Sequence, residues 1–154
     1  MRKDPDNQLM FIGLGGWDTH VNQGDKEGQL ARKFLSLGQA LSAFVKGLGK
    51  TYQDTVIVVL SEFGRTVREN GNRGTDHGYG NIAWVLGGGV RGGRFYGRWS
   101  GLEEENLFEG RDLQVTTDYR SLLGLIARRH LGVAGLDRLF PGFSPESRGL
   151  EGLF

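Results

Sequence analysis

Residues 55–60 (TVIVVL) form a run rich in β-branched side chains, and residues 56–60 of it are all apolar. A run without polar alternation is typical of a strand that is covered on both faces in a parallel sheet. A second apolar run, residues 10–14, ends at Gly15 and Gly16 and predicts another buried strand closed by a tight turn. Both runs are far shorter than the roughly 20 residues that a membrane-spanning helix needs. The chain is therefore expected to have an α/β core with buried strands.

An amphipathic stretch joins these two predicted strands. Its apolar positions recur every three or four residues, as on a helix that buries one stripe, and Gly47 and Gly49 mark its end. A strand, a helix and a strand in this order form a right-handed crossover that makes the two strands parallel. Their carboxyl ends are then expected to meet at one edge of the sheet. The apolar positions are Leu30, Phe34, Leu37, Leu41, Phe44 or Val45, and Leu48.

Two more elements are predicted downstream. Residues 82–86 (IAWVL) precede three glycines and predict a strand, and residues 90–97 predict a glycine-broken hairpin or loop. A second helix is predicted over 118–131, capped by Thr116 or Thr117. The predicted fold is a mostly parallel sheet flanked by helices. The positions of the second helix expected to face inward are Leu122, Leu123, Ile126 and Leu131.

Composition limits the classes of function. A chain of 154 residues has the size of one domain. Its 19 Lys and Arg against 18 Asp and Glu give a net charge of +1, which argues against nucleic acid as a partner. No apolar run supports a membrane span, and residues 1–8 (MRKDPDNQ) do not resemble a signal peptide. These features do not indicate a cellular compartment for the protein. The absence of cysteine excludes thiol catalysis and leaves carboxylates and three histidines as metal ligands.

Three short motifs each place an acid beside a base, after an apolar run or in a polar loop. Two imidazoles and several carboxylates on one rim form a mixed nitrogen and oxygen ligand set, which suits Zn²⁺, Mn²⁺ or Mg²⁺ in hydrolytic sites. The motifs therefore predict a metal centre. The alternative is a surface of capping residues around a glycine-rich edge. The pairs are Asp18 with His20, Glu62 with Arg65, and Asp76 with His77.

Two further basic residues have alternative roles. Arg65 can hold a substrate anion with its bidentate fork, or it can pair with Glu62. His130 is predicted in the last turn of the second helix, where an imidazolium gains from the helix dipole. We therefore expect a structural role for His130 rather than metal ligation.

Four motifs, in their order and spacing, resemble the bacterial sulfatase-like proteins grouped as domain of unknown function 1501, within the alkaline phosphatase and sulfatase superfamily. The resemblance covers roughly residues 9–142, so that 1–142 would form the carboxyl-terminal part of such a domain and 143–154 a tail. Residues 116–123 (TTDYRSLL) resemble the closing helix of that family. The four motifs are GGWDTHVNQ (15–23), SEFGRTVRENG (61–71), GTDHGYGN (74–81) and LGGGVRGGRFYG (86–97).

The resemblance implies an alkaline-phosphatase-like core fragment that hydrolyses phosphate or sulfate esters of small molecules or glycans, with a divalent metal at its strand ends. It does not distinguish Zn²⁺, Mn²⁺, Mg²⁺ and Ca²⁺. By position, Asp18, His20 and His77 resemble ligands of one metal. Glu62 stands where the superfamily has an acidic ligand, but Phe63 replaces the histidine that usually follows, so a second metal site lacks an imidazole.

Arg65 and Asp76 are left to bind the substrate anion or to support the ligands. The resemblance also implies that the nucleophile comes from an earlier strand of longer relatives, and Ser61 has no base beside it in sequence. The expected function is thus an incomplete metal-dependent hydrolase, with a non-catalytic metal- or anion-binding module as the alternative. A strand at Met10 without its neighbours would expose an edge and favour a homo-oligomer.

Overall fold

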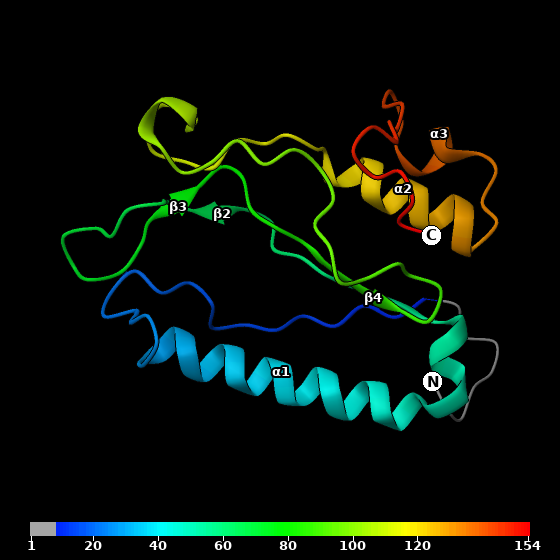
Figure 1. Cartoon of the computed structure of the whole chain (residues 1–154), viewed down its shortest axis with the longest axis horizontal. Helices are drawn as coiled ribbons and strands as arrows, with labels where there is room; N and C mark the ends of the chain where they lie inside the picture. The colour runs from blue at the N-terminus through cyan, green and yellow to red at the C-terminus, as the bar shows by residue number, and fades with distance from the viewer. Residues whose placement is uncertain (1–8) are drawn as a thin grey trace.

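The computed structural model describes residues 9–154 and arranges them in three layers (Figure 1). Helix α1 (Gln29–Leu48) forms one layer, strands β1 (Val56–Val59) and β4 (Trp84–Gly87) form the middle one, and helix α2 (Tyr119–His130) lies on the other side. The expectation for residues 1–8 lies outside the described residues. The shorter elements are η1 (Gly49–Asp54), β2 (Gly64–Arg65), β3 (His77–Gly78), η2 (Glu104–Asn106) and α3 (Leu136–Leu139).

The sheet is antiparallel, so the predicted mostly parallel sheet flanked by helices is wrong. Strand β1 pairs with β4, with Val56 opposite Gly87 and Val59 opposite Trp84. A second two-stranded sheet, β2 with β3, is also antiparallel. An apolar run identifies a strand from local sequence, but the direction of its neighbour depends on a partner far along the chain.

The predicted strand at residues 10–14 is also wrong. This segment belongs to no strand, and no backbone hydrogen bond joins it to any other described residue. Its side chains are exposed, Phe11 by 93% and Ile12 by 64%. An apolar run becomes a strand only where neighbours accept its hydrogen bonds, so the predicted parallel crossover does not form.

Helix α1 confirms the predicted amphipathic helix. It ends at Leu48, and its C-cap residue Gly49 has a φ of 56°, a conformation that glycine adopts at little cost. Leu37 and Leu48 are buried along the predicted stripe, whereas Phe34 remains exposed. Neighbouring layers therefore cover only part of the apolar stripe.

Helix α2 confirms the second predicted helix, but its cap differs from the prediction. Oδ1 of Asp118, rather than Thr116 or Thr117, accepts a hydrogen bond of 2.8 Å from the backbone N–H of Arg120. An aspartate at this position satisfies one of the free amides of the first turn. His130 lies in the last turn, as expected.

The main core lies between α2, the sheet and the end of the chain. Buried residues of α2 pack with Leu150 and Leu153, so residues of the predicted tail belong to the core. Leu122 and Ile126 of α2 are buried as predicted, whereas Leu131 is exposed. The partly buried residues packed against this core include Val56, Val58, Val85, Val90 and Phe154. None of the helices in residues 9–154 combines the length and the hydrophobicity that a transmembrane span requires.

Candidate metal centre

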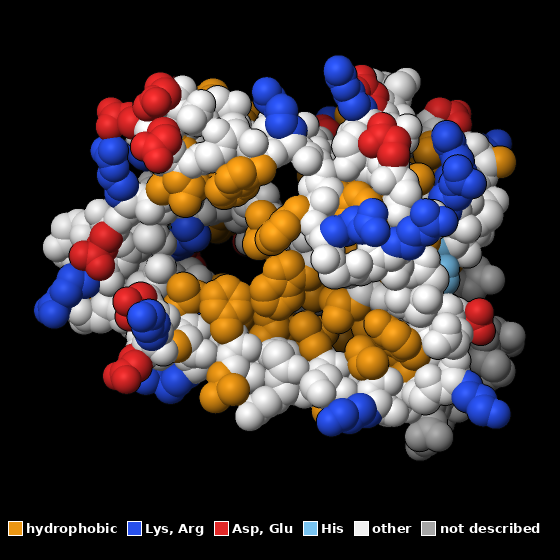
Figure 2. Space-filling model, in the orientation of Figure 1, with side chains coloured by type: hydrophobic (Ala, Val, Ile, Leu, Met, Phe, Trp, Pro, Cys, Tyr) orange, Lys and Arg blue, Asp and Glu red, His pale blue; other side chains and the backbone are white. Residues whose placement is uncertain are grey.

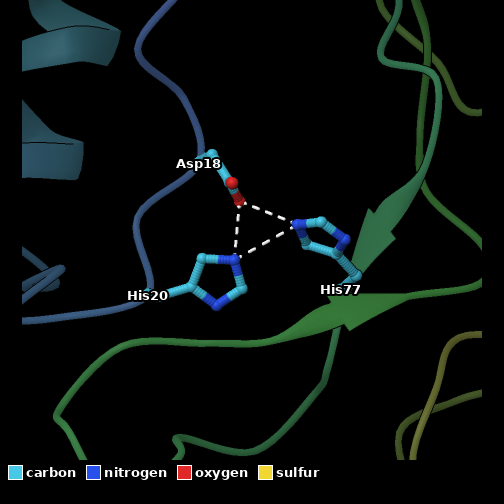
Figure 3. A group of neighbouring side chains, drawn as sticks. All are labelled: Asp18, His20 and His77. Atoms are coloured by element: carbon cyan, nitrogen blue, oxygen red, sulfur yellow. Dashed lines mark hydrogen bonds and ion pairs between the residues drawn. The ribbon is translucent and has the colours of Figure 1, made fainter.

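Asp18, His20 and His77 each direct one ligand atom toward a common point (Figure 3). Oδ1 of Asp18 lies 2.9 Å from Nε2 of His20 and 2.9 Å from Nε2 of His77. The two imidazole nitrogens lie 3.2 Å apart. Ligand atoms in a tetrahedral site with bonds of about 2.0–2.1 Å lie roughly 3.3 Å apart. The three atoms therefore fit one small divalent cation after a slight expansion.

Backbone hydrogen bonds bring the two segments of the site together. Gln23 donates its N–H to the carbonyl of Arg73 at 2.8 Å, and Thr75 donates to the carbonyl of Thr19 at 3.4 Å. Gly74 lies between these contacts, and a Cβ atom there would be 2.2 Å from the carbonyl carbon of His20. Only a glycine permits this close approach of the two chains.

The small sheet β2–β3 positions His77. Arg65 on β2 lies opposite His77 on β3, and Gly64 lies opposite Gly78. A Cβ atom at Gly78 would be 2.5 Å from the carbonyl carbon of Arg65. This tight pairing holds the imidazole of His77 beside the guanidinium of Arg65, although the two residues are 12 positions apart in the chain.

Arg65 orients Asp18 rather than pairing with Glu62. Its Nη1 donates to Oδ1 of Asp18, its Nε donates to Oγ1 of Thr75 at 3.0 Å, and its Nη2 donates to the Thr75 carbonyl. The guanidinium, and after it the hydrogen bond with His77, lowers the pKa of Asp18 below its ordinary value. Asp18 is therefore an anionic carboxylate at neutral pH, as ligation requires.

Asp76 supports His20 from the side away from the ligand point. Its Oδ1 lies 3.1 Å from Nδ1 of His20 and accepts a 2.9 Å hydrogen bond from Nδ2 of Asn70. The hydrogen bonds from Asn70 and then from His20 lower the pKa of Asp76. A carboxylate on one ring nitrogen keeps the proton there and leaves the other nitrogen free to ligate.

Sequence reasoning missed the part played by Asn70. Its Nδ2 also donates to the carbonyl of His20 at 3.1 Å, and its Oδ1 accepts from the N–H groups of Asn72 and Gly74 at 2.9 and 3.0 Å. The signal was the Asn-Gly dipeptide at 70–71, which is typical of turns whose Asn side chain bonds nearby backbone. Asn70 thereby ties the loop before β3 to both histidine-bearing segments.

The structure does not bring every predicted ligand to this point. Glu62 is not part of the described ligand group, and its Oε2 accepts a hydrogen bond of 3.4 Å from Oγ of Ser61. The ring of Phe63 stacks on His77, with centroids 4.1 Å apart and planes inclined by 30°. His130 is also outside the described group.

The site is open to solvent on one side. The side chain of Asp18 is 57% exposed and that of His77 is 51% exposed, whereas Arg65 behind them is 24% exposed. A ligand can reach the ligand atoms without a rearrangement of the backbone. Of the two supporting groups, Arg65 is the less exposed, whereas the side chain of Asp76 is 57% exposed.

Comparison with known proteins agrees with the motifs at the level of the family. The model of the family described as "Protein of unknown function (DUF1501)" matches residues 1–139. No curated protein and no solved structure matches the chain significantly. The wider placement among phosphatases and sulfatases stays a prediction. Because the match spans most of the sequence, the chain belongs to the DUF1501 family.

Proposed function

We propose that the chain binds one divalent metal ion through Asp18, His20 and His77, and that this centre serves the hydrolysis of phosphate or sulfate esters. The observation that carries the proposal is the convergence of two imidazole nitrogens and one carboxylate oxygen on a solvent-open point. These three side chains come from two segments more than 50 residues apart.

The donor set narrows the choice of metal. Mg²⁺ and Ca²⁺ prefer sites made wholly of oxygen, whereas imidazole ligands suit Zn²⁺ and other first-row ions. Two nitrogens and one oxygen therefore favour Zn²⁺ or Mn²⁺ over Mg²⁺ and Ca²⁺. Three protein ligands also leave coordination positions for water or substrate, which is typical of catalytic rather than structural zinc.

The chain's own residues prepare the site for such an ion. Arg65 keeps Asp18 anionic, and Asp76 is placed to accept a hydrogen bond from Nδ1 of His20, which would leave the lone pair of Nε2 free to bind an ion. A divalent ion, when bound, supplies Lewis acidity and lowers the pKa of coordinated water. An ester oxygen would approach from the exposed side of Asp18 and His77.

The ester specificity rests on the motifs that resemble sulfatase-like proteins. Phosphate and sulfate monoesters hydrolyse so slowly without a catalyst that positioning and anion stabilisation must supply much of the acceleration. Arg65 is already engaged by Asp18 and Thr75, and Ser61 contacts Glu62 rather than a histidine. We therefore expect slow turnover from this chain even with metal supplied.

The engagement of Arg65 favours a second candidate, metal binding without hydrolysis. In that case the centre would hold an ion or an anion, and the three ligands would serve binding alone. The two candidates share the metal site and differ in whether an ester reacts there. Activity, rather than metal affinity, distinguishes them.

The test is an assay with a generic aryl phosphate and an aryl sulfate, in the presence of Zn²⁺, Mn²⁺, Mg²⁺ or Ca²⁺ in turn. Hydrolysis predicts slow turnover with Zn²⁺ or Mn²⁺ that is lost in Asp18→Ala and retained in Asp137→Ala, an acidic residue on α3. Metal binding without turnover would support the second candidate. Fast turnover lost in Asp18→Ala would show that this chain holds a complete site.

A further inference from the structure

The segment Leu9–Leu14 lies outside every described helix and strand. Five of its six residues are large and apolar, and all five are exposed. No backbone hydrogen bond joins the segment to any other described residue. Unpaired amides and carbonyls in an extended chain form a template on which another strand pairs.

The segment continues into an aromatic surface on the adjacent layers. The ring of Phe34 on α1 lies 5.2 Å from that of Trp17 and 5.9 Å from that of Trp84 on β4, measured between ring centroids. Figure 2 shows hydrophobic side chains gathered in the middle of the molecule, between α1 and the upper layer. We call Leu9–Leu14, Trp17, Phe34 and Trp84 together the apolar face.

The accessible surface of the chain is too large for a compact monomer. It measures 11279 Å², whereas a folded monomer of 17.0 kDa is expected to expose about 7,700 Å². After about 1,300 Å² is allowed for residues outside the described range, an excess of more than about 2,000 Å² remains. Obligate dimer interfaces bury about 2,000 Å² or more in total, and the exposed side chains of the apolar face are part of the surface available for one.

The properties of the segment favour a second copy as the occupant. Each copy presents the same segment, so two copies can pair about a two-fold axis, with the same surface used twice. Residues 9–16 (LMFIGLGG) contain no charge, and the net charge of the chain is only +1. Electrostatic repulsion therefore does not oppose the approach of two copies.

We propose that the chain forms a homodimer in which the Leu9–Leu14 segments of two copies pair as antiparallel strands and bury the apolar face. The paired segments satisfy each other's backbone groups. Their side chains alternate between the two sides of the new ribbon and pack on α1 and β4 of both copies. This dimer does not depend on the metal centre.

The test is sedimentation velocity of the whole chain over a range of concentrations, with helix content followed by circular dichroism. Ile12→Pro removes the backbone N–H that would donate a hydrogen bond across the dimer. Within the chain, this N–H donates to no other described residue. Leu14→Lys places a charge on the apolar face, and its matched control is Leu139→Lys on α3. The wild-type exposures of Leu14 and Leu139 are 58% and 49%.

We expect a wild-type dimer with a dissociation constant raised at least about tenfold by Ile12→Pro and by Leu14→Lys, and by less than about twofold by Leu139→Lys. A wild-type monomer at all concentrations would overturn the proposal, as would polydisperse aggregates without a dimer. A dimer that both test variants leave unchanged would also overturn it, because another surface would then form the interface. If one of the two test variants, Ile12→Pro or Leu14→Lys, loses its helix content, the dissociation constant of the other variant tests the proposal.

Discussion

Arg65 donates a hydrogen bond from Nη1 to Oδ1 of Asp18, which lies 47 residues earlier in the chain. The same oxygen contacts the imidazoles of His20 and His77. The guanidinium therefore favours the anionic form of the oxygen that both imidazoles contact. It also weakens the carboxylate as a donor to a cation, so we expect ion binding at the proposed site to depend on the competition between Arg65 and the ion for Asp18.

Replacing Arg65 should raise the pKa of Asp18 toward its ordinary value. The guanidinium is the largest cause of the lowered pKa in the folded protein, and Arg65→Gln removes its charge. An NMR titration of the Asp18 carboxyl group measures this change. Arg68→Gln is the control, because Arg68 pairs with Glu104 at 2.7 Å rather than with the site. An unchanged Asp18 titration in Arg65→Gln would contradict this role.

Removing the carboxylate behind His20 should weaken metal binding. Groups that orient a ligating histidine typically contribute about 10- to 100-fold to metal affinity. Asp76→Ala is therefore expected to lower the affinity for Zn²⁺ by that factor, measured by competition with a chelating dye. Asp137→Ala serves as the control. Equal affinities in the two variants would show that Asp76 does not support the ligand.

A methyl group at Gly74 should separate the two halves of the site. Its Cβ atom would lie 2.2 Å from His20 backbone atoms, whereas a Cβ atom at Gly71 in the same loop meets nothing within 4 Å. Gly74→Ala is expected to reduce Zn²⁺ affinity by about tenfold or more, and Gly71→Ala by less than about twofold. The same chelator competition measures both. Similar losses in both variants would mean that the close approach is not what holds the ligands.

Helix α2 should lose stability when its cap is removed or protonated. Replacing an N-cap residue with alanine typically costs about 1 kcal/mol, so Asp118→Ala should unfold at lower denaturant than Asp118→Asn. The pKa of Asp118 is lowered, mainly by its hydrogen bond with Arg120. Its contribution is therefore complete above the unfolded pKa of about 3.9 and is lost as pH falls through the lower folded value.

Denaturant unfolding curves between about pH 2 and pH 6 measure this dependence. The wild-type protein should lose more stability on acidification than Asp118→Asn, since the variant has no carboxylate to protonate at the cap. The Asn side chain still accepts the hydrogen bond from the Arg120 amide, so it preserves the helix start. Parallel pH profiles for the two proteins would contradict the assignment of the cap.

Sequence predicted the elements whose signals are local. The spacing of Leu37, Leu41 and Leu48 predicts α1, because helical periodicity needs no distant partner. Strand direction was not predictable in this way, because the partner of β1 lies more than 20 residues further along the chain. The run at 10–14 was misassigned for a related reason: its composition fits a strand, but no described neighbour pairs with it.

In the candidate site, too, the residues in short local motifs were predictable, whereas the contacts between distant segments were not. Asp18, His20 and His77 were identifiable because each sits in a short motif that joins an acid to an imidazole. The bond from Arg65 to Asp18 was not, because sequence proximity pointed to Glu62 instead. Asn70 was missed because its contact with the carbonyl of His20 reaches a segment 50 residues away.

The most direct test of the metal centre is a calorimetric titration of the whole chain with Zn²⁺, compared between His77→Ala and His130→Ala. Both variants remove one imidazole, but only His77 contributes an atom to the ligand group. We predict one ion per chain, an affinity lowered more than about tenfold by His77→Ala, and a change of less than about twofold in His130→Ala. Equal affinities in the two variants, or no binding by the wild-type chain, would contradict the metal centre.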